Sequence, residues 1–275
     1  MLSNASRFVT YLLAALYAVL GSLLFIFPEQ LAPVFAWKVT PFMTMTIGGW
    51  CLGNAWLAFL TARRWDWRLV HPSLLYLWIF GVSEALVVLF FRGKLQLVHP
   101  IAWLYLVTLA VNLVAAGLGA ADWRRVRPPR TGTERMTGLL RAFPIGFIVF
   151  VGFLGLYGLV ARIGDIATNG EIFPEVMSLF TLRSFGAFYM SLALSVVPLL
   201  FERDRGPFLH HSAAALGLVV IITIAGLAYL RVFNLQEHPY QLAYFAAYLA
   251  SGVFQVIILL KYGSGLARRS AEGAS

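Results

Sequence analysis

Eight long apolar stretches decide what this chain can fold into. They cover residues 8–27, 42–62, 72–91, 100–121, 142–161, 183–201, 212–230 and 239–261. A helix that crosses the hydrocarbon core of a bilayer needs about 20 mostly apolar residues, and each stretch has that length. Inside hydrocarbon the backbone must satisfy its own hydrogen bonds, which a helix does. The sequence therefore predicts an all-α, multi-pass membrane protein with eight transmembrane helices.

The distribution of basic residues predicts how these helices are oriented. The net charge is +9, which in a soluble domain would indicate a nucleic-acid partner. Of the 21 lysines and arginines, fifteen fall in segments on the side of the N-terminus and six on the other side. Because cytoplasmic loops carry the excess of positive charge, both termini are expected in the cytoplasm and the protein in the cell membrane. No nucleic-acid partner is needed to explain the charge.

Short motifs recur in the same order in the two halves of the chain. The matched segments are Ile26-Phe27-Pro28-Glu29 with Ile172-Phe173-Pro174-Glu175, Leu16-Tyr17 with Leu156-Tyr157, Arg64 with Arg203, Arg92 with Arg231, and His99-Pro100 with His238-Pro239. From Arg64 onward the spacing between matched residues is constant. The chain is thus predicted to be a tandem repeat of a four-helix unit. Since four is an even number of spans, the units would be parallel and related by a pseudo-twofold axis along the membrane normal.

This repeat sets the expected domain organisation. Residues 1–121 form the first membrane unit, 122–141 a basic cytoplasmic linker, 142–263 the second unit and 264–275 a cytoplasmic tail. The linker contains Pro128-Pro129 and Thr131-Gly132-Thr133, which are typical of a connector. Its arginines also suit contact with anionic membrane lipid.

Polar residues inside the apolar stretches are the first candidate site. Glu84 is the one carboxylate within a span, and such groups are functional-site hypotheses by default. With a rise of about 1.5 Å per residue, Asn54 and Asn112 fall near the same depth, so an Asn-Glu-Asn ligand-binding cluster is expected. The alternative is that a protonated Glu84 only joins helices by hydrogen bonds. The repeat places Thr223 and Ser251 where the first unit has Glu84 and Asn112.

The second candidate site lies on the outer face. The predicted topology gathers there two carboxylates, three arginines and two imidazoles: Glu29, Glu175, Arg92, Arg231, Arg183, His99 and His238. They form either a polar vestibule for a ligand or a structural ion-pair network. These motifs also have a purely structural interpretation, since proline, glutamate and histidine are common at helix starts. His99 and His238 meeting as an axial haem pair is a further alternative.

Several classes of chemistry have no residues to support them. Cys51 is the only cysteine, which excludes an intrachain disulfide and a cysteine-rich metal cluster. No H-E-x-x-H, G-x-S-x-G or phosphate-binding glycine loop stands in a suitable context. The sequence therefore assigns no catalytic residue, metal or cofactor.

One set of features resembles a known family. A span that ends in Phe-Pro-Glu, the step Arg183-Ser184-Phe185-Gly186-Ala187 opening a span rich in glycine and alanine, and Ile47-Gly48-Gly49 in the corresponding region together resemble DoxX-like small membrane proteins, here in tandem. The resemblance implies a four-helix membrane unit, and some members of that family are associated with membrane quinone redox systems. The first unit departs from the pattern, because Thr44 and Met45 stand where the arginine is expected.

Two functions from different classes fit these features. In the first, the bundle binds or transports a small or lipophilic molecule, with Glu84, Asn54 and Asn112 as polar contacts. In the second, the chain is a non-catalytic accessory or scaffold subunit of a larger respiratory or photosynthetic membrane complex. An enzyme that acts on lipid or quinone with His99 or His238 as base is a third reading, which no residue spacing demands.

Overall fold

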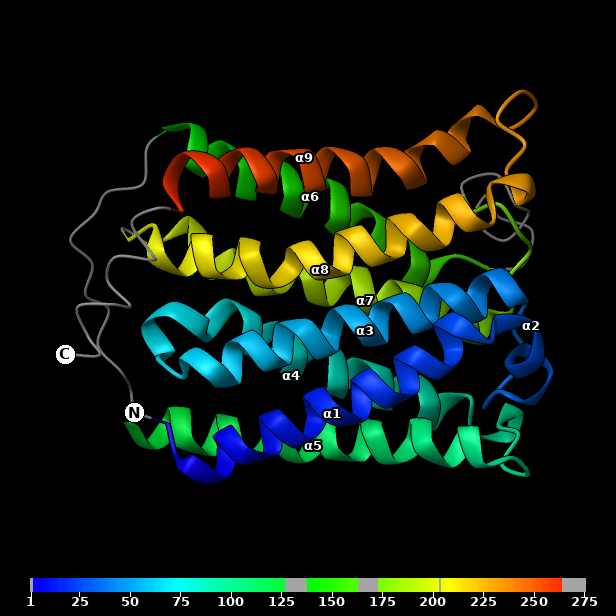
Figure 1. The fold of residues 1–275 in the computed structure, drawn as a ribbon, viewed down its shortest axis with the longest axis horizontal. Coiled ribbons are helices and arrows are strands. Elements are labelled where there is room, and N and C mark those ends of the chain that lie inside the picture. Colours follow the sequence, from blue (N-terminus) through cyan, green and yellow to red (C-terminus); the bar gives the residue numbers. More distant parts are fainter. Residues whose placement is uncertain (1, 127–137, 163–172, 203, 264–275) are drawn as a thin grey trace.

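A computed structural model of the chain describes residues 2–126, 138–162, 173–202 and 204–263, and these form helices with no β-strand. Eight long helices run side by side along the long axis of the bundle (Figure 1). Their bounds are α1 Asn4–Ile26, α3 Pro41–Arg64, α4 Trp67–Phe90, α5 Pro100–Val126, α6 Gly138–Val160, α7 Leu179–Val196, α8 Gly206–Ala228 and α9 Leu242–Tyr262. Short helices in the connectors are α2 Pro28–Leu31, η1 Ala32–Val34, η2 Arg92–Lys94, η3 Val197–Leu200, η4 Leu230–Val232 and η5 Pro239–Gln241.

Small hydroxyl residues begin three of the long helices. Ser3, Thr40 and Ser178 each accept a hydrogen bond of 3.2 Å from the backbone N–H three residues later. Each bond satisfies one of the four N–H groups that a helix start leaves free. Asp66 caps α4 in a similar way through the N–H of Arg68 at 3.0 Å. Because α4 starts at this cap, it begins five residues before the predicted span and includes Pro72.

The proline motifs mark helix starts, as the sequence predicts. Pro28 begins α2, Pro100 begins α5 and Pro239 begins η5. The second Phe-Pro-Glu motif differs, because Pro174 lies in a non-helical connector. The predicted linker at 122–141 is shorter than expected among the described residues, since α5 extends to Val126 and α6 begins at Gly138. Residues 127–137 of that linker, and the predicted tail at 264–275, lie outside the described part of the chain.

Seven of the long helices are long and apolar enough to cross a membrane: α1, α4, α5, α6, α7 with η3, α8, and α9 with η5. The predicted span at 42–62 is α3, which has 24 residues but is richer in glycine, threonine and asparagine. Sixteen of those 24 residues are buried. The small and polar residues of α3 therefore face other helices, where small side chains allow close packing.

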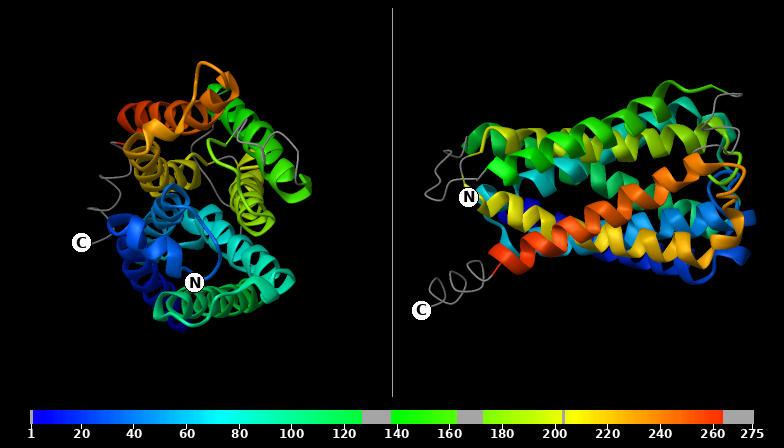
Figure 2. Two further views of the ribbon diagram at one scale, coloured as in Figure 1. Left: turned by 90° about the vertical axis from the view of Figure 1, so that its right-hand side faces the viewer. Right: turned by 90° about the horizontal axis from the view of Figure 1, so that it is seen from above.

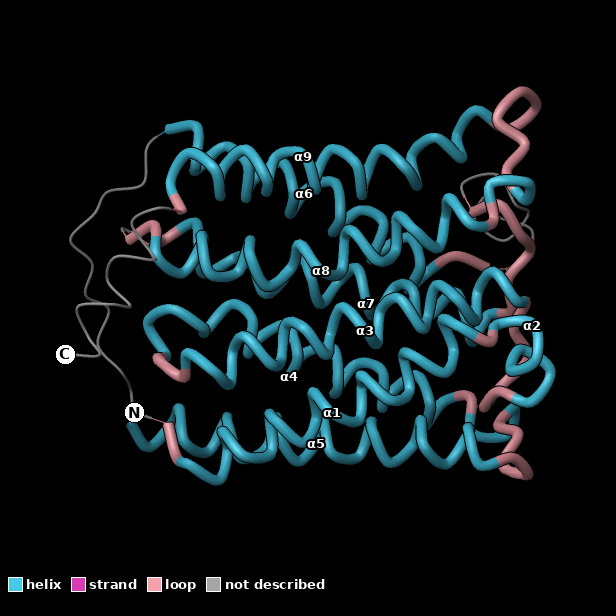
Figure 3. The backbone as a smooth tube through the Cα atoms, viewed as in Figure 1, coloured by secondary structure: helices cyan, strands magenta, loops and turns pink. Residues whose placement is uncertain are grey.

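The first four long helices occupy one half of the bundle and the last four the other half (Figure 1; Figure 2, left). Within the halves α1 packs on α3 and α6 on α7, while α5 packs on α1 and α4, and α9 on α8. Between the halves α3 packs on α8, α4 on α7, and α4 on α8. We call the end where α1 begins and α9 ends the proximal end and the opposite end the distal end. Figure 3 shows the connectors, in pink, gathered at these two ends.

Glycines allow a close contact between helix backbones in each half. A Cβ added to Gly21 of α1 would lie 2.7 Å from a backbone nitrogen of α3, and one on Gly48 of α3 would lie 2.6 Å from a backbone nitrogen of α1. In the other half, a Cβ on Gly155 of α6 and one on Gly186 of α7 would each meet a backbone nitrogen of the facing helix at 2.6 Å. No side chain fits at these four positions without moving a backbone.

Candidate functional site

Glu84 is buried where three helices meet. Its side chain is 3% exposed and lies six residues before the end of α4. Oε1 accepts hydrogen bonds from the Tyr105 hydroxyl of α5 at 2.7 Å and from the Ser184 hydroxyl of α7 at 2.9 Å. Oε2 has no partner within the described ranges, and no described lysine, arginine or histidine pairs with the carboxyl. The carboxyl therefore joins the two halves while one of its oxygens stays unsatisfied.

A small cavity adjoins this carboxyl. Its volume is about 30 Å³. A buried water needs about 10–15 Å³ together with polar partners, so the cavity has room for about one or two waters. Binding pockets for small organic molecules are about ten times larger. The lining residues are Tyr17, Leu20, Trp37, Ile47, Trp50, Cys51, Phe80, Glu84, Tyr105, Thr108 and Leu109.

Trp37 reaches the cavity from a distal connector. It belongs to the segment between η1 and α3 but is only 2% exposed, because the segment folds back into the bundle. Its indole Nε1 donates to the Thr181 hydroxyl of α7 at 3.1 Å, and its ring stacks on Phe180 with centroids 4.3 Å apart. This ring is one of the residues that line the cavity.

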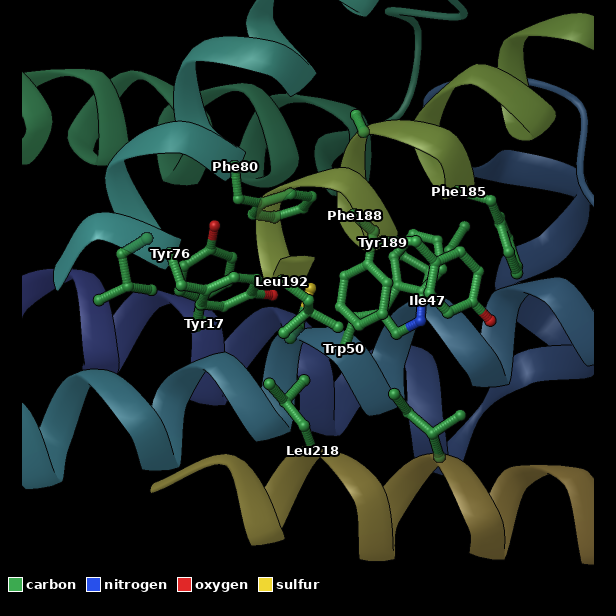
Figure 4. Close-up of a cluster of buried hydrophobic side chains, with 14 of the residues drawn as sticks. Tyr17, Ile47, Trp50, Tyr76, Phe80, Phe185, Phe188, Tyr189, Leu192 and Leu218 are labelled. Carbon is green, nitrogen blue, oxygen red and sulfur yellow. The ribbon is translucent and has the colours of Figure 1, made fainter. Parts of the chain in front are cut away.

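The two predicted asparagines form a neighbouring cluster instead of binding Glu84. Asn54 Oδ1 accepts from the Tyr76 hydroxyl at 2.7 Å, and Asn112 Nδ2 donates to the Tyr17 hydroxyl at 2.8 Å. Asn54 Nδ2 and Asn112 Oδ1 are buried and have no partner in the described chain. The expected Asn-Glu-Asn cluster is therefore wrong in its pairing, because tyrosines provide the hydrogen bonds. Tyr17 links the two clusters, since it also lines the cavity. Figure 4 shows its hydroxyl and that of Tyr76 within the buried cluster.

The two repeated glutamates on the distal face each bond to the other half. Glu29 Oε1 accepts from the Tyr229 hydroxyl at 2.8 Å, and Glu175 accepts from the Thr40 hydroxyl. Burial, and then the bond to Glu29, raise the pKa of Tyr229 to about 12. Burial also raises the pKa of Glu175, against the opposing effect of Thr40. The guanidinium of Arg231 lies 6.0 Å from the Tyr229 ring centroid.

The other predicted distal residues do not complete a ring. Arg183 Nη1 donates to the carbonyl of Gly158 at 2.8 Å, one of the last carbonyls of α6, so this arginine caps a helix end. Arg92 is exposed in η2. His99 precedes α5 and His238 precedes η5, and α5 and α9 lie on opposite sides of the bundle (Figures 1 and 2). The structure therefore does not bring the two imidazoles together as a haem pair.

His99 instead lies at an apolar groove of about 380 Å³. The groove is separate from the cavity beside Glu84. Leu23, Leu31, Val34, His99, Pro100, Ile101 and Leu104 line it.

A third polar cluster, at the proximal end, was not singled out by the sequence. Ser73 Oγ and His211 Nδ1 share a hydrogen bond of 3.0 Å between α4 and α8. His71 Nε2 lies 3.7 Å from Glu202 Oε1, just before α8. The repeat gives a partial signal for this cluster, because His71 and His210 have the same spacing as Arg64 and Arg203 and both are buried, whereas His211 corresponds to Pro72.

The described residues contain no group of three or more histidine, cysteine, aspartate or glutamate side chains that could hold a metal ion. Comparison of the chain with protein-family models, with curated proteins and with solved structures gives no match. The geometry of the three clusters is therefore the basis for assigning a function.

Proposed function

We propose that the chain is a tandem pair of four-helix membrane units in which α3 is an eighth transmembrane helix. Trp50 of α3 and Phe188 of α7 stack with centroids 4.4 Å apart and planes at 7° (Figure 4). Their spacing in the chain is one residue shorter than the repeat spacing that begins at Arg64. Gly48 and Gly186 have the same spacing as this pair and mark the same kind of helix crossing. Equivalent residues meet each other where two units share a twofold axis, so the stacked pair supports such an axis.

The proposed orientation has both termini in the cytoplasm. The start of α1 and the end of α9 lie together at the proximal end (Figure 1). The same end holds the start of α6 and the described end of α5 with Arg124 and Arg125. Positive charge next to the membrane favours the cytoplasmic side, which makes the proximal end cytoplasmic and the distal end external.

We infer that Glu84 takes up and releases a proton, with water in the adjoining cavity, as the central site of a pathway for protons or a small polar solute. The observation that carries this is the unpaired Oε2 of a buried carboxyl that lines a water-sized cavity. A charge at this depth is costly unless it is paired or neutralised. The cavity is too small for a bulky lipophilic molecule, which favours the small-solute form of the predicted binding function.

Side chains that can exchange protons lie along one face of α4 and support a route to this site. Ser73, Tyr76 and Glu84 are spaced by three and eight residues, which places them within about 80° on the helix. Ser73 contacts His211 at the proximal end, and Tyr76 contacts Asn54 near the middle. Hydroxyl, imidazole and carboxyl groups can pass protons between hydrogen-bonded waters. The route would enter at the proximal histidines and reach Glu84 through the tyrosine-asparagine cluster.

Proton flux in proteoliposomes tests this function. A pH gradient across the vesicle membrane is followed with an enclosed pH-sensitive dye. Wild-type protein is expected to dissipate the gradient, and Glu84→Gln, which keeps the shape but cannot ionise, is expected to lose most of the flux. Thr223→Val is the matched control, because Thr223 occupies the equivalent position in the second half and, within the described residues, its hydroxyl donates to its own helix backbone at Val219. Equal flux through wild type and a folded Glu84→Gln variant rejects the proposal, as does a wild type without flux.

A further inference from the structure

The groove beside His99 has the position and shape of a lipid site. Leu23 of α1, Leu31 of α2 and Val34 of η1 form one wall, and Ile101 and Leu104 of α5 form the other. At about 380 Å³ it falls within the size range of small-molecule pockets. The groove lies where α1 ends and α5 begins, which is the level of the headgroups if the helices span the bilayer.

The connectors that border the groove carry an excess of positive charge. The connector between α1 and α3 exposes Lys38, and the one between α4 and α5 exposes Arg92 and Lys94. The backbone N–H of Gln96 donates to the carbonyl of Ala36 at 2.8 Å, so the two connectors lie against each other. No described carboxylate forms an ion pair with these three cations, and Glu29 is the one acidic residue in the two connectors.

The corresponding surface in the other half differs in charge. There the connector between α8 and α9 carries Arg231 but also Glu237, whose carboxylate accepts from Asn234 Nδ2 at 2.6 Å. Arg231 itself lies against the Tyr229 ring. Compared with this described connector of the other half, the connectors beside the groove carry a larger excess of the positive charge that suits an anion.

We propose that this groove binds one anionic phospholipid of the outer leaflet. An acyl chain occupies the apolar walls, and the phosphate lies among His99 and the cationic connectors. The apolar lining favours a lipid over a free phosphate as the main ligand, because His99 is the one lining side chain that can donate a hydrogen bond. The proposed lipid site does not depend on the proposed role of Glu84, because Glu84 lines a different cavity.

Native mass spectrometry of the purified full chain tests the site with two defined probes, dioleoyl phosphatidylglycerol and dioleoyl phosphatidylcholine. Wild-type protein is expected to retain the anionic lipid in preference. Leu104→Trp fills the groove and should abolish retention, whereas Leu113→Trp, on the same helix at an exposed position outside the groove, should leave it unchanged. Melting temperatures of the variants check that each is folded.

A charge variant keeps the test decisive if Leu104→Trp does not fold. Replacing Lys38, Arg92 and Lys94 with glutamine should lower the preference for phosphatidylglycerol by about fivefold per charge near the headgroup, with little change in phosphatidylcholine binding. Equal retention of the two lipids by wild type overturns the proposal. Equal retention of the anionic lipid by Leu104→Trp and Leu113→Trp also overturns it. So does the finding that the molecule lost from Leu104→Trp is a quinone and not a phospholipid.

Discussion

Glu29 and Glu175 occupy the same place in the repeated Phe-Pro-Glu motif, and each carboxylate reaches across to the other half of the molecule. Their partners differ, because Glu29 binds a tyrosine hydroxyl at the end of α8 and Glu175 binds the hydroxyl that caps α3. The motif is thus used twice to hold the distal ends of the halves together. Both contacts are hydrogen bonds to hydroxyl groups, whereas the structural alternative predicted for the distal charges is a network of ion pairs.

Stability is expected to fall with rising pH because of Glu175. Burial raises the pKa of this carboxyl in the folded state, so the folded protein holds its proton more tightly than the unfolded chain. That stabilising contribution is complete below the ordinary glutamate pKa and is lost as the pH rises through the raised value. Glu175→Gln removes the titration while its amide oxygen still accepts from Thr40.

The measurement is the melting temperature in detergent between pH 4 and 8. The wild-type curve should decline with pH more steeply than that of Glu175→Gln, and the variant should be at least as stable as wild type at neutral pH. Glu237→Gln, at an exposed carboxylate in the distal connector, is the control and should follow wild type. Identical slopes for wild type and Glu175→Gln contradict the assignment.

The sequence identifies which polar residues are buried but not how they pair. Glu84, Asn54 and Asn112 are all within the core, as expected from their positions in apolar spans. Their partners are Tyr105, Tyr76, Tyr17 and Ser184, and hydropathy treats a tyrosine much like any aromatic core residue. Depth along a helix can be read from the sequence, whereas the rotation that decides which side chains meet is set by packing.

At the scale of the elements, α3 is as long as the other long helices but less apolar, because it is packed inside the bundle. Its small and polar residues lower its hydropathy, because it faces α1, α4 and α8 over most of its surface. The prediction of a helix at 42–62 is confirmed, with ends at Pro41 and Arg64. That it crosses the membrane remains a prediction, since a helix enclosed by other helices does not need an apolar surface.

Helix packing accounts for several of the tryptophans, which are concentrated in the first half. Trp37, Trp50, Trp65 and Trp78 are each at most 8% exposed. Trp103 and Trp123 are exposed near opposite ends of α5, where aromatic belts form at the two membrane interfaces. Packing within the chain and the bilayer interfaces explain these six positions, but not Trp56, which is 44% exposed on α3.

Tight helix contact predicts opposite effects for two glycine substitutions. Gly48→Ala places a methyl 2.6 Å from a backbone nitrogen of α1 and should destabilise the bundle by about 1–3 kcal/mol through overpacking. Gly117→Ala, on α5, meets no atom within 4 Å and should be neutral or stabilising by up to about 1 kcal/mol, as alanine is the better helix former. Unfolding titrations in mixed micelles measure both. A Gly48→Ala variant as stable as Gly117→Ala excludes the close crossing.

For the whole molecule, the glycine crossings refine the repeat that the sequence predicts. They pair Gly21 with Gly155 and Gly48 with Gly186. The first spacing is five residues shorter than the constant spacing from Arg64 onward, and the second is one residue shorter, which small changes in connector length explain. The match of Leu16-Tyr17 with Leu156-Tyr157, one residue longer than that constant spacing, does not fit this geometry. The Leu-Tyr match is based on residue identity alone. The crossings instead mark the positions at which a glycine lets two helix backbones come into contact.

The proposed topology predicts on which side of the membrane four engineered cysteines lie. Cys51 is the only native cysteine and is 5% exposed, so wild-type protein should not react with a membrane-impermeant maleimide. In intact spheroplasts Lys94→Cys should be labelled, whereas Asn4→Cys, Arg124→Cys and Lys261→Cys should react only after permeabilisation. These side chains are exposed at helix ends. The comparison of Asn4 with Arg124 is decisive for α3, because an even number of spans between them places both on one side. Labelling of these two positions from opposite sides shows that α3 does not cross, and with that the four-plus-four arrangement and its axis along the membrane normal are lost.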